Sequence, residues 1–149
     1  MRTRFYPTME IENRIAYLLV NQVLNNCCTV SVNDGEETTL RKSANVQKIL
    51  DALGTTDSDT LTIFGDEGER VGYFWLIWGN GQDLISDYSA SNESDFQYMA
   101  DVIDIVDEKI EAYVIAEAKR ERRAKRARER SKNVDSLDNY EAAFPNDIS

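Results

Sequence analysis

The feature that most limits the possible folds is a nearly unbroken apolar run at residues 71–78, VGYFWLIW. It is short, uncharged and rich in β-branched and aromatic side chains, which is typical of a strand. Glycine-containing segments at 65–68 and 79–81 allow the chain to turn at both ends. We therefore predict a central strand with little water on either face. Its side chains should alternate, with Val71, Tyr73, Trp75 and Ile77 on one side and Phe74, Leu76 and Trp78 on the other.

Further strands are predicted on both sides of this run. Residues 60–64 and 84–88 complete a three-strand meander over 60–89. A hairpin precedes the meander, with strands at 29–32 and 38–40. Asp34-Gly35 between these two strands predicts a type I′ turn.

Two helices alternate with the strands. The first is predicted over about 8–26, because apolar residues recur at helical spacing and form one buried stripe. Ser43 is predicted to cap the second helix, and Gly54 occupies the position that a C-terminal glycine prefers. The expected core residues of the first helix are Ile11, Ile15, Leu18, Leu19 and Val23, and those of the second are Val46, Ile49, Leu50 and Leu53.

A long helix is predicted from Glu93 onward. Its apolar residues follow alternating spacings of three and four, which is a heptad pattern. This stripe either packs on the protein's own sheet or pairs with the same helix of a second copy; the stripe is Phe96, Met99, Ile103, Val106, Ile110 and Tyr113.

The charge inverts after Ala118. Residues 119–132 contain nine Lys/Arg and two Glu, a net charge of +7, whereas the whole chain has a net charge of −10. We expect this basic segment to project as an exposed helix, because it has no apolar face to bury. The predicted partner-binding residues are Lys119, Arg120, Arg122, Arg123, Lys125, Arg126, Arg128, Arg130 and Lys132.

Together these elements predict an α+β fold with a mostly antiparallel sheet of about five strands, in the order α-β-β-α-β-β-β-α. A single domain should span 1–118 and include the first half of the long helix. The basic helix 119–132 follows. Residues 133–149 form an acidic tail that is expected to be flexible or ordered by a partner.

The composition argues against an enzyme. The sequence contains no histidine, which removes the commonest general base and metal ligand. It also lacks a phosphate-binding loop or a dinucleotide fingerprint, so no cofactor and no catalytic residue is predicted. Asp83 and Asp87 could hold a metal cation from one face of the last strand, but two solvated carboxylates are the preferred interpretation, and no metal site is predicted.

Tyr73 and Trp75 raise the alternative of a sheet surface on which nucleic-acid bases stack. Such a surface needs cations for the phosphates, and Arg70 is the cation near these residues in the sequence. We therefore prefer core packing for both aromatic side chains.

The chain is expected to be a soluble protein. The first apolar stretch, 11–24, is interrupted by polar residues and has neither the length of a membrane span nor the pattern of a targeting signal. Cys27 and Cys28 are neighbours in the sequence, so we expect thiols in a reducing compartment. The predicted location is the cytoplasm.

Three runs resemble a family of small uncharacterised phage and prophage proteins: SVNDGEETTLRKS at 31–43, LDALGTTDSDTL at 50–61 and ERVGYFWLIWGNGQDLISDYS at 69–89. The shared motifs are a D-G-E-E hairpin, a T-D-x-D-T-L strand entry and a G-N hairpin that leads to a D-x-I-x-D-Y segment. The resemblance covers residues 31–89 and implies a phage-encoded accessory protein. The location that it implies is the cytoplasm of the host cell, with association to a virus particle as the alternative. It carries over no activity.

The expected function is therefore that of a non-enzymatic phage accessory protein that binds a host or phage protein. One form of this function is inhibition of a host defence protein or of a host protein that handles nucleic acid. The alternatives are a nucleic-acid-binding protein that uses the basic helix and a structural component of a phage particle. A homodimer or larger assembly through the C-terminal helix is a further expectation, and no membrane partner is predicted.

Overall fold

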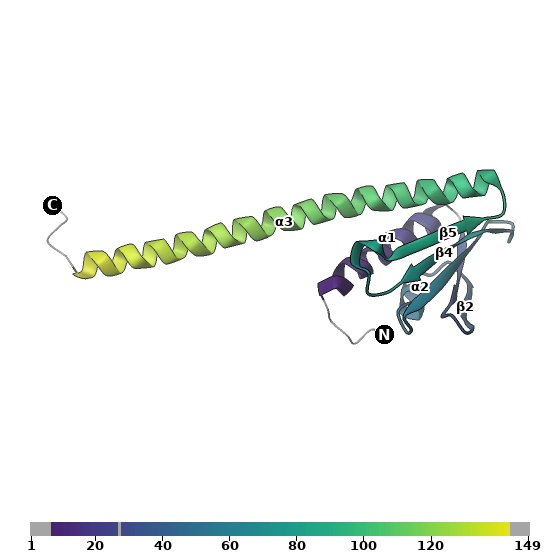
Figure 1. Ribbon diagram of the computed structural model, residues 1–149, viewed down its shortest axis with the longest axis horizontal. Helices are drawn as coiled ribbons and strands as arrows, with labels where there is room; N and C mark the ends of the chain where they lie inside the picture. The colour runs from purple at the N-terminus through teal and green to yellow at the C-terminus, as the bar shows by residue number, and fades with distance from the viewer. Residues whose placement is uncertain (1–6, 27, 144–149) are drawn as a thin grey trace. The chain divides into compact units, whose positions relative to one another are not determined.

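The elements occur in the predicted order. A computed structural model describes the backbone of residues 7–26 and 28–143, and the side chains of 10–26 and 28–132. These residues form an α+β fold of three α-helices, one short 3-10 helix and five strands (Figure 1). The elements are α1 (Pro7–Asn25), β1 (Thr29–Asn33), β2 (Thr38–Ser43), α2 (Val46–Ala52), β3 (Ser58–Phe64), β4 (Arg70–Ile77), η1 (Gly81–Asp83), β5 (Ile85–Ala90) and α3 (Glu93–Ala143).

The five strands form one antiparallel sheet in the order β2-β1-β3-β4-β5. Strands β2 and β5 are therefore its edges. The register aligns residues far apart in the sequence, because Trp75 in β4 lies opposite Thr60 in β3 on one side and Asp87 in β5 on the other. Asn33 in β1 lies opposite Thr60 and extends the same row.

One face of this sheet forms the core. Buried and partly exposed residues alternate along β1 and β3, which is the pattern of a sheet covered on one side. Helices α1 and α2 and the first part of α3 supply the opposing apolar residues (Figure 1). The core side chains include Leu19, Val23, Val30, Val32, Ile49, Leu53, Leu61, Ile63, Phe74, Leu76, Met99, Val102 and Val106.

Strand β4 differs from the prediction that both of its faces are dry. Phe74 and Leu76 are fully buried, but the side chain of Trp75 between them is 41% exposed. The physical reason is that the helices of this part of the chain cover the same face of the sheet. Val71 is also buried, and the register between β3 and β4 shifts near it, between Ile63 and Phe64.

The hairpin turn also differs from the prediction. A type I′ turn would join the strands through two residues, whereas the loop here spans residues 34–37. The Asp34 carboxylate accepts hydrogen bonds from the backbone N–H groups of Glu36 and Glu37, each at 3.0 Å. These bonds stabilise the charged form and lower the pKa of Asp34 below its ordinary value.

Asn45, not Ser43, caps helix α2. The Asn45 side chain accepts a hydrogen bond from the Lys48 backbone N–H at 3.0 Å, while Ser43 ends strand β2. The predicted glycine at the other end is confirmed, because Gly54 follows the C-cap residue Leu53 with φ of 77°.

The chain divides into two compact units, and the division falls within helix α3. Unit 1 is Met1–Ile110 and unit 2 is Glu111–Ser149. The predicted domain boundary at 118 stays a prediction. The backbone of residues 133–143 continues α3 and is helical, although a flexible or partner-ordered tail was predicted there. Residues 144–149 of that tail lie outside the described residues. Of the helices described, none combines the length and the apolar character that a membrane crossing requires.

Tyr98 anchors α3 to the end of α1. Its hydroxyl accepts a hydrogen bond from the Asn26 side chain at 3.1 Å and lies 3.9 Å from the Sγ atom of Cys28. Cys28 is a buried thiol, as predicted, and Cys27 lies outside the described residues. Burial raises the pKa of Tyr98 from 10.0 to about 12, because the low-dielectric surroundings disfavour the phenolate.

This raised pKa predicts a pH-dependent loss of stability. The folded state favours the neutral phenol, so its contribution is complete below about pH 10 and is lost as the pH rises toward 12. Ultraviolet titration of tyrosinate should therefore show one late step that disappears in Tyr98→Phe. The prediction fails if the late step persists in that variant.

Candidate functional site

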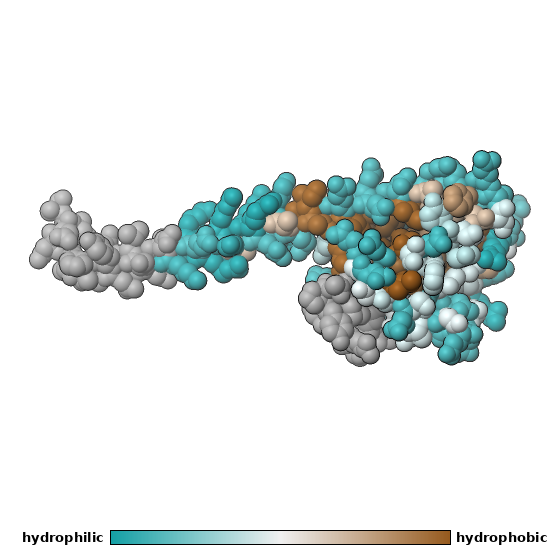
Figure 2. Space-filling view, viewed as in Figure 1, coloured by the Kyte–Doolittle hydropathy of each residue, from teal (hydrophilic) through white to brown (hydrophobic). Residues whose placement is uncertain are grey.

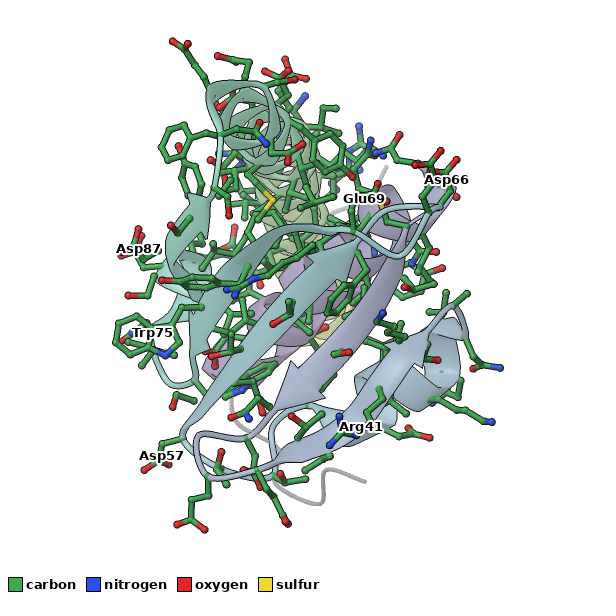
Figure 3. All side chains as sticks on the ribbon, turned by 90° about the vertical axis from the view of Figure 1, so that its right-hand side faces the viewer. Arg41, Asp57, Asp66, Glu69, Trp75 and Asp87 are labelled. Carbon is green, nitrogen blue, oxygen red and sulfur yellow. The ribbon has the colours of Figure 1, made fainter. Side chains whose placement is uncertain are left out.

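Unit 1 presents one face of its sheet to solvent, which we call the open sheet face. It consists of the residues that alternate with the core side chains. Figure 3 shows this face with Trp75, Asp87 and Arg41 labelled. Its members are Ser31, Asn33, Thr60, Thr62, Phe64, Tyr73, Trp75, Asp87 and Ser89.

A cationic side chain lies over each of two aromatic rings of the open sheet face. The Lys42 Nζ atom lies 4.6 Å from the centroid of the Phe64 ring, and the Arg70 Cζ atom lies 5.7 Å from that of the Tyr73 ring. These distances are in the range of cation–π interactions. Strand β2 therefore adds a cation to this face, although Arg70 alone was expected there.

Trp75 differs from these two aromatic side chains because its ring is exposed to solvent. The preference for core packing is wrong for this side chain, which is 41% exposed. Asp87 lies directly opposite it in β5 and is also exposed, and the two residues lie near each other in Figure 3. The result is an exposed indole ring beside a carboxylate.

The interpretation of Asp83 and Asp87 as residues of one strand face is wrong. Asp83 lies in η1, while Asp87 lies in β5. Within the described residues, no group of three or more acidic or cysteine side chains is placed to hold a metal ion.

The structure buries two carboxylates, those of Glu12 and Asp59, whose burial was not predicted. Glu12 in α1 accepts hydrogen bonds from the backbone N–H groups of Gly79 and Asn80, at 2.7 and 3.3 Å. Asp59 in β3 accepts hydrogen bonds from the Gly54 backbone N–H at 2.8 Å and from the Trp78 indole N–H at 2.7 Å.

These bonds indicate a structural role, because both carboxylates are almost completely inaccessible to solvent. Together they fix the turn between β4 and η1 to helix α1 and strand β3. The burial of Glu12 could have been predicted from its position in the sequence. Glu12 lies four residues before Ala16 and seven before Leu19, which places it on the buried face of α1.

Unit 2 contains the second candidate surface, the basic segment at 119–132. Every side chain of this segment is exposed, and Figure 2 shows hydrophilic surface along this part of α3. One ion pair is present at its start, where Arg120 contacts Glu117 at 2.7 Å. Both side chains of this pair are solvated, so the pair contributes little to stability.

Four of the nine cations share one face of the helix. Lys119, Arg123, Arg126 and Arg130 are separated by four, three and four residues, which places them in one row. We call this row the cationic stripe. Glu121 lies on the opposite side of the helix and does not interrupt it.

The predicted self-association stripe divides into buried and accessible residues. Met99, Val106 and Ile110 are buried in unit 1 and contribute to its core. Phe96 is 46% exposed, with its ring centroid 5.0 Å from that of Tyr88 in β5. Ile103 and Tyr113 are partly exposed. Self-association through this stripe stays a prediction, but its three buried residues are covered by the chain itself.

No family model, curated protein or solved structure matches the chain. The resemblance to phage proteins therefore stays a prediction. The open sheet face and the basic segment are the two features of the structure that bear on function.

Proposed function

We propose that this protein acts by binding another protein and that the basic segment of α3 is the main contact. One observation carries the proposal: α3 continues past Ile110 as an exposed helix with nine cations at 119–132. An isolated helix without an apolar face gains nothing from the core of its own domain. Its charge is therefore available for an acidic partner. The role is that of a non-enzymatic accessory protein.

Charge favours a protein partner over nucleic acid. The basic segment has a net charge of +7 within a chain of net charge −10, so the remaining residues carry −17. This excess repels a phosphate backbone at long range, whereas a protein surface can place its acidic patch opposite the basic segment alone. Nucleic-acid binding is the second candidate, because the cationic stripe also fits a row of phosphates.

The test is a capture experiment with two matched variants. The stripe variant carries Lys119→Gln, Arg123→Gln, Arg126→Gln and Arg130→Gln. The control variant removes equal charge elsewhere on the segment through Arg120→Gln, Lys125→Gln, Arg128→Gln and Lys132→Gln. Each full-length protein is used to capture partners from a nuclease-treated lysate at low and physiological salt, and the captured proteins are quantified.

We expect the stripe variant to lose roughly tenfold or more of the partner that the unmodified protein captures, and the control to lose much less. Capture should also fall with rising salt. Equal losses in the two variants would contradict a specific role for the cationic stripe. If capture is seen only from a lysate that has not been treated with nuclease, and the purified protein retards DNA or RNA in a gel at physiological salt, the second candidate replaces the first.

A further inference from the structure

The open sheet face binds cations over aromatic rings at two places. Lys42 occupies the ring of Phe64 and Arg70 that of Tyr73. Trp75 is the third aromatic side chain of this face, and indole is the best cation–π acceptor among the side chains. Among the described residues no cation lies over Trp75, and its ring is accessible to solvent.

Asp87 adds a carboxylate to this ring. It stands opposite Trp75 in the register of β4 and β5, so the Cβ atoms of the two residues are about 5 Å apart. One Asp87 oxygen already accepts the Tyr88 backbone N–H at 2.8 Å, which restrains the rotation of the carboxylate. A carboxylate can accept further hydrogen bonds.

An indole ring beside a carboxylate matches the guanidinium group of arginine. The planar cation can stack on the ring while its N–H groups donate to the carboxylate. A phosphate group would instead be repelled by Asp87, so this part of the face is poorly suited to nucleic acid. Asp57 lies near the same end of the sheet in Figure 3 and adds to the negative charge there.

We infer that the Trp75–Asp87 pair binds an arginine side chain from the basic segment of a second copy of this chain. This inference rests on the proposed function, in which the basic segment contacts a protein, and it identifies that protein as a second copy of the chain. Residues 1–110, which contain the open sheet face, have 8 Lys/Arg and 19 Asp/Glu, and their net charge of −11 complements the +7 of the basic segment. Arg41 and Lys42 of β2 repel the incoming helix and favour the β4–β5 side of the face, where Asp87 lies.

The first measurement is the mass of the purified full-length protein by light scattering at low and physiological salt. We expect concentration-dependent dimers or larger species that weaken as salt rises. The face variant, Trp75→Ala with Asp87→Asn, should weaken association by roughly tenfold or more. A matched control, Tyr17→Ala with Glu67→Gln, removes an exposed aromatic ring and a carboxylate elsewhere and should associate normally.

Complementation separates docking from damage to the fold. The face variant keeps its basic segment, and the stripe variant keeps its open sheet face. Each variant alone should associate roughly tenfold or more weakly than the unmodified protein. An equimolar mixture should form a complex, because the face variant supplies the arginine side chains and the stripe variant supplies the Trp75–Asp87 pair. Damage to folding would not be corrected by mixing.

The inference is overturned if the unmodified protein is a monomer at all concentrations and salts, or if the face variant associates as well as the control. A monomer that still captures another protein through the cationic stripe would leave the proposed function intact. A protein that associates through the face but shows equal capture by the stripe and control variants would count against the proposed function instead.

Discussion

Gly72→Ala is expected to destabilise unit 1 by about 3 kcal/mol or more, because the new methyl group has no space. A Cβ atom at this position would collide with the backbone carbonyl oxygen of Ser89 in β5. It would also lie 3.2 Å from the Ala90 Cβ atom and 3.2 Å from the Met99 Cε atom. The obstacle is backbone held in the β4–β5 ladder, so relief requires the edge strand and α3 to move together.

Gly65→Ala is the matched control for this change. A Cβ atom at Gly65 would meet the carboxylate of Glu69, which is the far end of a flexible side chain and can rotate away. We expect the control to cost less than about 1 kcal/mol. Urea denaturation followed by far-ultraviolet circular dichroism measures both variants. Equal midpoints for the two would show that β5 and α3 pack less tightly against β4 than the structure describes.

The order of elements was predictable because each element carries its own periodicity. The alternation along β3 and the apolar spacing of α2 each depend on a few neighbouring residues. The basic segment was predictable for the same reason. A helix of Lys, Arg, Glu and Ala without an apolar face stays exposed wherever the domain lies.

The placement of Trp75 could not be predicted from the strand alone. An apolar run is compatible with burial on one face or on both. The outcome depends on which face the helices cover, and the helical side chains of unit 1 gather on the side of Phe74 and Leu76. The cation over Phe64 was missed for a related reason, since Lys42 reaches that ring across the sheet from β2.

The buried carboxylates depend on still longer-range geometry. Glu12 bonds to backbone groups at residues 79 and 80, and backbone donors leave no mark in the sequence that could identify them as partners. A polar residue on the apolar face of α1 signals that something must compensate its burial. It does not indicate what the compensating group is.

Glu12→Ala is therefore expected to be the second strongly destabilising change, by about 3 kcal/mol. It removes the acceptor for the N–H groups of Gly79 and Asn80 and leaves a cavity in a site with 0% exposure. Glu12→Gln should cost less, about 1 kcal/mol, because both N–H groups donate to the same oxygen, Oε2, and an amide oxygen can accept both bonds. Glu10→Ala is the control, since it removes the same charge from an exposed position of the same helix. Urea denaturation ranks the three variants, and amide exchange at residues 79 and 80 should accelerate first in Glu12→Ala. If Glu12→Ala and Glu10→Ala are equally stable, the Glu12 carboxylate does not hold the turn after β4 to α1.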